Sequence, residues 1–344
     1  MMTKPHRSKV YVNDIDENSA LQEIQNGLRF IQFRDIVGKD ASVFIKPNLT
    51  ADSHAPGITT TPLMIRTVVK VVAPLVSKVI IGESDGGNYS FSADASLKNH
   101  QIYDIAEECE NVDVVNLSNL PRKRITGTVC GKRVWVDLPK LLVEDIDCFI
   151  SLAVFKTHAM THGSFSIKNL WGCYPDPMRL LFHKNLDYKL ALISKLVKNK
   201  IQILDGFWAL DGHGPMEGTP VSINKVLVAN DPVAADSTAA HLMKLDAGKI
   251  THLRVAEEFG LGRSDMSAIE FNKAISSEEL PKFLPYKIRL DYLSVLFFKS
   301  ELISKAVLSS PLTPLVYKLV NSRRPENQRT YWADYNKRSV FHNK

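Results

Sequence analysis

Short apolar runs rich in β-branched residues alternate with helical segments along most of this chain, and this alternation constrains the fold more than any other feature. The strand-like runs occupy residues 43–49, 79–84, 112–117, 148–155, 201–204 and 221–229. The helical segments occupy residues 60–75, 95–109, 186–198 and 233–245. Strands separated by helices predict βαβ units, and hence an α/β fold with a mainly parallel sheet and helices on both faces.

Two segments depart from this alternation. Residues 125–136 place Cys130-Gly131-Lys132 between two β-branched runs, which predicts a β-hairpin inserted into the α/β body. The C-terminal end is basic and partly amphipathic, and it is predicted to form a helical arm. We therefore expect three regions: an N-terminal strand and helix over residues 1–42, an α/β core over residues 43–264, and the arm over residues 265–344.

The formal net charge of +6 is concentrated in the arm. Residues 284–344 hold 11 Lys or Arg against 4 Asp or Glu, whereas the preceding residues hold 32 against 33. Apolar patches at 292–298, 302–308 and 312–320 lie between basic residues, which suits either an arm packed on the body or an interfacial membrane contact. We expect a membrane surface or a protein as the partner of the arm. Nucleic acid is not expected, because no nucleic-acid-binding signature accompanies the charge.

Location and cofactor content follow from what the chain lacks. No apolar run is long enough to span a bilayer, and the polar N-terminus leads into no signal-peptide core. The four cysteines are scattered without a C-x-x-C pair, so we expect no iron–sulfur cluster held by this chain's own cysteines. Sparse thiols suit a reducing compartment. The predicted location is the cytoplasm, with peripheral attachment to a membrane as an extension of that prediction.

Polar residues lie at or after the ends of five of the strand-like runs, where the carboxyl ends of parallel strands would share one edge of the sheet. They are Lys46, Asn48 and Thr60 for the first of these runs, Glu83 and Ser84 for the second, Lys156, Thr157, His158, Lys168 and Asn169 for the third, Asp205 for the fourth, and Asp231 and Asp236 for the fifth. We expect these side chains to converge on one site.

The residue types suggest separate roles in that site. The three lysines suit the binding of a phosphate or carboxylate, and the hydroxyl and amide side chains suit its orientation. His158 is the candidate general acid or base, because its ordinary pKa lies near neutrality, and Glu83 or Asp205 is its candidate catalytic partner. Asp231 and Asp236 are the candidate ligands of a divalent metal.

Several motifs occur in a fixed order along the chain: IKPNL with PGITTTP, IGESDGG, KTHAMT with SIKNLWGC, ILDG with GHGP, and ANDPVAAD. Together they resemble the domain-of-unknown-function family numbered 362, from about Val43 to Gly262. The resemblance implies an α/β fold. Some members carry a fused two-cluster ferredoxin module, which implies redox chemistry for them, but this chain has neither that module nor its cysteines.

The expected function is an enzyme that acts on a small anionic substrate, phosphorylated or carboxylated, at the strand ends. No G-x-G-x-x-G after a strand, Walker loop or G-x-S-x-G elbow is present, so the corresponding nucleotide-binding and hydrolase classes have no support. Two alternatives stay open. One is a redox or cofactor-handling protein that works with a partner's iron–sulfur cluster or flavin. The other is a non-enzymatic accessory protein that docks to a membrane or a complex through its basic tail.

Overall fold

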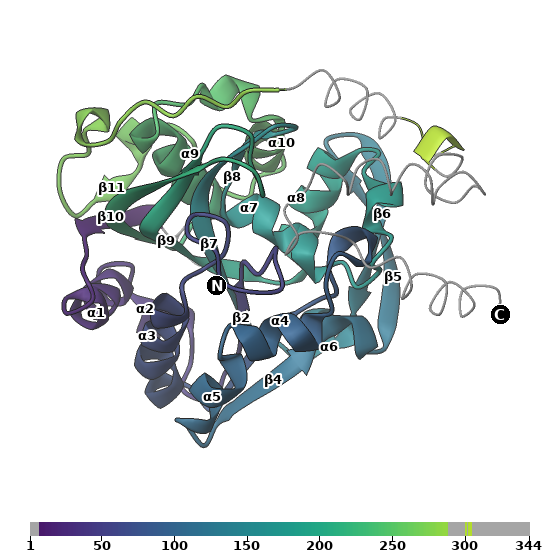
Figure 1. Cartoon of the computed structure of the whole chain (residues 1–344), viewed down its shortest axis with the longest axis horizontal. Helices are drawn as coiled ribbons and strands as arrows, with labels where there is room; N and C mark the ends of the chain where they lie inside the picture. Colours follow the sequence, from purple (N-terminus) through teal and green to yellow (C-terminus); the bar gives the residue numbers. More distant parts are fainter. Residues whose placement is uncertain (1–6, 288–299, 301, 305–344) are drawn as a thin grey trace, which may run out of the picture.

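A large mixed sheet forms the centre of the molecule (Figure 1). The computed structural model describes residues 7–287, 300 and 302–304. The strands lie in the order β11-β1-β10-β9-β7-β2-β3-β4, and β8 pairs with β7 off this path. Their bounds are β1 Lys9–Asp14, β2 Ser42–Pro47, β3 Lys78–Glu83, β4 Val112–Asn116, β7 Cys148–His158, β8 His162–Ser164, β9 Asn199–Asp211, β10 Thr219–Ala229 and β11 Glu270–Phe271.

The central strands β9, β7, β2, β3 and β4 are all parallel, as the alternation of strands and helices predicts. The inserted hairpin is also confirmed: β5 (Arg122–Val129) and β6 (Lys132–Pro139) pair antiparallel as a separate two-stranded sheet. Cys130 and Gly131 connect them, both with positive φ, as a tight hairpin turn requires. The α/β prediction is therefore confirmed for the described residues.

Helices cover both faces of the sheet, because alternate side chains of the central strands point to opposite sides. Val43 and Ile45 pack with the helices of one face, and Phe44 packs with those of the other. The first face carries α1 (Ala20–Phe30), α2 (Phe33–Ile36), α3 (Pro62–Val72), α4 (Ala93–Asn99) and α5 (Ile102–Glu107). The second carries α6 (Lys140–Glu144), α7 (Ser166–Asn169), α8 (Leu186–Leu196), α9 (Pro232–Leu242), α10 (Thr251–Glu258) and the hairpin.

The direction of β10, the strand predicted over residues 221–229, differs from the prediction. β10 runs antiparallel to β9, because residues 212–218 join the two strands as a hairpin and contain no crossover helix. The carboxyl end of β10, which Asp231 follows, therefore lies at the opposite edge from the carboxyl ends of β2, β3 and β7. The expectation that all five strand ends meet at one edge is wrong for this strand.

Local sequence signals predict the start of one helix correctly and miss a break in another. Thr61 caps α3 by accepting a hydrogen bond from the Met64 N–H, with Pro62 in the first turn, as the Thr-Pro pair predicts. The helix expected over residues 95–109 is instead divided into α4 and α5. Gln101 has a φ of 61° at the division, and that left-handed conformation interrupts the helix.

Most of the C-terminal arm, residues 288–299, 301 and 305–344, lies outside the described residues, and its described part contributes β11 to the sheet. The patches at 292–298 and 312–320 are outside the described residues, as is 302–308 apart from residues 302–304. Within the part of the chain that is described, no helix is long and apolar enough to cross a membrane.

Gly57, in the loop between β2 and α3, allows that loop to approach β9 closely. Its φ is +73°, and a Cβ there would lie 2.5 Å from the carbonyl oxygen of Ala209. We predict that Gly57→Ala lowers the free energy of unfolding by at least about 2 kcal/mol, because strain and a backbone clash add. Chemical denaturation measures the change. Gly38→Ala, where a Cβ would meet nothing within 4 Å, is the control, and equal effects of the two substitutions would contradict the prediction.

Candidate functional site

A buried ion pair joins the carboxyl ends of β2 and β3. The Lys46 ammonium donates to the Glu83 carboxylate, and their side chains are 1% and 4% exposed. The same ammonium donates to the Pro47 carbonyl oxygen at 2.7 Å. The Glu83 carboxylate also accepts from the backbone N–H groups of Leu49 (3.2 Å) and Ser84 (2.9 Å). The pair is thus fully hydrogen-bonded within the fold.

The segment after α7 closes over this pair. Gly172 lies against it so tightly that a Cβ would be 2.9 Å from Lys46 Nζ and 3.0 Å from Glu83 Oε1. Ser84 Oγ donates to the Gly172 carbonyl at 2.6 Å and accepts from Arg179 at 2.6 Å. Asn169 donates to the Lys46 carbonyl oxygen at 3.0 Å. The structure therefore brings Lys46, Glu83, Ser84 and Asn169 together, as an interlocked network.

Lys156, near the end of β7, is a buried cation without a carboxylate partner among the described residues. Its ammonium donates only to the Ile58 carbonyl oxygen, at 2.9 Å, and to Thr50 Oγ1, at 3.3 Å. Burial lowers its pKa to about 7, and the positive charges of Lys168 and Lys46 lower it further than Glu83 raises it.

Lys168 projects from α7 and has no hydrogen-bond or ion-pair partner in the described part of the chain. Burial lowers its pKa to about 8, and the Arg179 guanidinium adds to that effect while Asp187 opposes it. Lys168 is also an electrostatic neighbour of Lys156 and His158. The fold therefore gathers two cations that it does not neutralise.

His158 ends β7 and is held in one neutral tautomer. Its Nδ1 accepts a hydrogen bond from the Met160 N–H at 3.1 Å, which leaves the ring proton on Nε2. Burial, and then Lys168 and Lys156, keep the pKa of His158 well below its usual range. His158 and His162 face each other across the β7–β8 hairpin and not along a helix, although their spacing of four also fits a helix.

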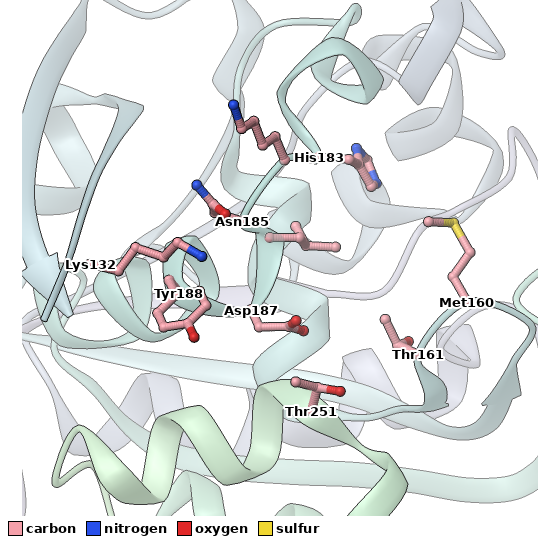
Figure 2. A pocket seen from close by; sticks show the side chains of 10 residues that line it. Lys132, Met160, Thr161, His183, Asn185, Asp187, Tyr188 and Thr251 are labelled. Carbon is pink, nitrogen blue, oxygen red and sulfur yellow. The ribbon is translucent and has the colours of Figure 1, made fainter. Parts of the chain in front are cut away.

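A cavity of about 330 Å³ opens beside these groups, at the lower end of the range for small-molecule pockets. Met160 and Thr161, which follow β7 directly, form one wall (Figure 2). The remaining lining residues come from the hairpin, from the segment before α8 and its first turn, and from the start of α10: Lys132, His183, Lys184, Asn185, Leu186, Asp187, Tyr188 and Thr251. The pocket thus lies next to the carboxyl end of β7, on the face of the sheet that carries α8 and α10.

Sequence reasoning missed three titratable groups of this region. His183 and Asp187 line the pocket, and His252 is fully buried beside Thr251 with no partner for either ring nitrogen among the described residues. Burial, followed by the charge of Lys168, lowers the pKa of each histidine to about 3. The one available signal was the start of the 186–198 helix, since a helix N-terminus favours anions. Nothing in the sequence linked His252 to this place.

Four other predicted site residues hold the strand ends in position. Thr60 Oγ1 accepts from the Asn48 N–H at 2.9 Å and donates to the Leu152 carbonyl at 3.0 Å. Thr157 Oγ1 donates to carbonyl oxygens of β9 and of the loop that follows it. The Asp205 carboxylate accepts from the Thr61 N–H at 2.7 Å and its hydroxyl at 2.9 Å, and burial raises the pKa of Asp205 to about 6.

The two candidate metal ligands lie apart from the pocket lining. Asp231 caps α9 by accepting from the Val233 and Ala234 N–H groups, at 2.8 and 2.9 Å. Asp236 accepts from the N–H and hydroxyl of Ser166, and burial raises its pKa to about 7. Among the described residues, no group of three or more His, Cys, Asp or Glu is placed to hold a metal ion.

Comparison with known proteins identifies a family. The family described as "Domain of unknown function (DUF362)" matches residues 43–241, so the match ends before Gly262. A thylakoid-associated protein of Synechocystis sp. is 30% identical over 124 residues, which span 34% of this chain and 39% of that protein. A crystal structure of a protein from Thermotoga maritima aligns with a TM-score of 0.31 and 14% identity, over 54% of this chain and 50% of the other.

We predict that Glu83→Gln lowers the free energy of unfolding by about 3–5 kcal/mol, because it leaves the Lys46 ammonium buried without a counter-charge. Chemical denaturation measures the loss. The control is Asp113→Asn, which breaks the surface ion pair between Asp113 and Lys78, whose side chains are 59% and 47% exposed. This control should lower the free energy of unfolding by no more than about 1 kcal/mol. A Glu83→Gln loss as small as that of the control would show that the buried pair is not important for stability.

Proposed function

Because this chain belongs to the DUF362 family, whose function is unknown, its activity has to be argued from the pocket, and we propose that it is an enzyme acting on a small anionic substrate bound there. The observation that carries the proposal is the unneutralised positive charge around the cavity. Lys132 and Lys184 line the cavity, against the single lining carboxylate of Asp187. Beside it, Lys168 acts electrostatically on Asp187 and His183, and neither Lys168 nor Lys156 has a hydrogen-bonded carboxylate partner in the described chain.

Buried cations of this kind favour an anionic ligand for an energetic reason. A buried ammonium without a counter-charge is costly, and the depressed pKa values of both lysines record that cost. A phosphate or carboxylate beside Lys168 supplies the missing charge. The cost of assembling the cations is then recovered as binding energy when the ligand enters.

His158 is the group that we assign to proton transfer. Its Nε2–H is free to donate to a ligand, since Nδ1 is occupied by the Met160 N–H. A bound anion would raise the pKa of His158 toward neutrality, where general acid and base catalysis is most effective. Glu83 and Asp205 accept several hydrogen bonds each, so we assign them the positioning of Lys46 and of the β2–α3 loop.

The test compares wild type with Lys168→Met, using sulfate as a probe whose charge does not change between pH 6 and 9. We predict at least a tenfold loss of sulfate affinity by calorimetry, with a melting temperature that is unchanged or higher, because the substitution removes an uncompensated buried charge. Wild-type affinity should fall as the pH rises through about 7 and about 8, where Lys156 and Lys168 lose their protons. Lys98→Met, at an exposed position of α4, is the control.

Equal sulfate affinity in wild type and Lys168→Met would overturn the assignment of the anion site. Turnover is then examined on any anionic compound that native mass spectrometry finds bound to the purified wild type. We expect wild type to convert that compound and His158→Ala to retain it unchanged. Conversion by His158→Ala at the wild-type rate would remove His158 from the chemistry.

A second function, peripheral membrane association, is favoured by the Synechocystis relative, a thylakoid-associated protein, and by the basic residues 284–344. The chain spans only 39% of that relative, so the association is proposed for this chain on its own charge. Lys and Arg near a surface favour anionic lipids through electrostatic attraction that salt screens.

We predict that the full chain floats with vesicles containing phosphatidylglycerol and not with vesicles of phosphatidylcholine alone, and that high salt releases it. The variant Arg323→Glu/Arg324→Glu should bind the anionic vesicles at least several-fold more weakly, because the two substitutions lower the net charge of this basic region by four units. Lys98→Glu/Arg133→Glu, which changes the charge of the body equally, is the control. Flotation that ignores lipid charge would contradict this function.

A further inference from the structure

Asp187 is the feature of the pocket that a purely cationic anion site does not explain. Its carboxylate points into the cavity, between Lys132 and Thr161 (Figure 2). It is bonded to its own backbone N–H, and it has no other hydrogen-bond or ion-pair partner in the described part of the chain. Burial raises the pKa of Asp187, although the nearby charges of Lys168, Arg254 and Lys132 lower it. A half-buried acceptor therefore faces the space that the ligand would fill.

The walls of the cavity offer two kinds of polar group. Lys132 and Lys184 line it with positive charge, and the charge of Lys168 acts on the lining residues His183 and Asp187, so these surroundings suit an anionic group. The Asp187 carboxylate only accepts, and the hydroxyls of Thr161, Thr251 and Tyr188 line the same cavity. A ligand that matches both kinds must carry an anionic group and at least one hydrogen-bond donor.

We propose that the substrate of this pocket is a small hydroxylated anion, whose charged group binds among Lys132, Lys184 and the neighbouring Lys168 and whose hydroxyl donates a hydrogen bond to Asp187. This inference rests on the proposed function. A simple anion would be repelled by Asp187 and would leave that carboxylate without a donor. A ligand ammonium is disfavoured, because the lysines around the cavity already exceed its carboxylates. A hydroxyl satisfies Asp187 without adding charge, and the cavity volume is at the lower end of the range for small-molecule pockets.

The test measures two matched pairs of ligands by calorimetry on the full-length wild type at pH 7. Glycerol 3-phosphate is compared with propyl phosphate, and glycerate with propionate. Within the pair that binds, we expect the hydroxylated member to bind about tenfold tighter or more, as for a hydrogen bond to a charged group. Which pair binds distinguishes a phosphate from a carboxylate as the anionic group.

Asp187→Asn supplies the second measurement, with Asp113→Asn on β4 as the control. Without the Asp187 charge, propyl phosphate or propionate should bind more tightly than to wild type, and the preference for the hydroxylated member should fall below about threefold. Equal affinities within both wild-type pairs would overturn the hydroxylated substrate but not the anion site. Binding of sulfate without binding of any of the four ligands would have the same meaning. Failure to bind sulfate as well overturns the proposed function itself. Should Asp187→Asn fail to fold, the wild-type pairs alone decide.

Discussion

Burial of charge at the carboxyl ends of β2, β3 and β7 is the constraint on which the rest of this structure depends. Three parallel neighbours each end in an ionisable side chain, Lys46, Glu83 and Lys156, at a place where water has little access. Lys46 and Glu83 neutralise each other, and the surrounding chain supplies backbone donors and an acceptor to complete their hydrogen bonds. Gly172 lies directly against the pair, and a side chain at this position would push Lys46 and Glu83 out of place.

The buried polar residues fall into two energetic classes. Asp205, Asp231 and Asp236 each accept hydrogen bonds from a loop or helix start, so their burial connects distant parts of the chain and stabilises the fold. Lys168 and His252 have no such partners in the described chain, and Asp187 has only its own N–H. Unsatisfied groups of this kind destabilise a fold, and their concentration around one cavity is the pattern expected of a ligand site.

Much of the fold followed from local pattern, and the limits of that pattern are physical. The apolar runs predicted the parallel strands because strands buried on both faces must be apolar along their length. The reversal at β10 departs from the alternation, because no helix lies between β9 and β10 and the short hairpin that joins them makes the two strands antiparallel. The difference between satisfied and unsatisfied charges could not be predicted. Asp205 and the Thr61 that satisfies it are 144 positions apart in sequence, and only the packed sheet brings them together.

The pocket itself shows the same limit. Lys168 and His158 were identified from polar residues after a strand. In contrast, His183 and Asp187 line the cavity from the segment before α8 and from its first turn, and His252 follows the lining residue Thr251 on α10. Burial holds the ammonium groups only partly protonated near neutral pH and the imidazoles neutral. An anion that enters stabilises the protonated forms, so ligand binding and proton uptake are coupled by the same electrostatics that make the empty pocket unfavourable. Under the proposed function, the charge that the fold leaves unpaired determines both which ligand the pocket favours and how protons are distributed once that ligand is bound.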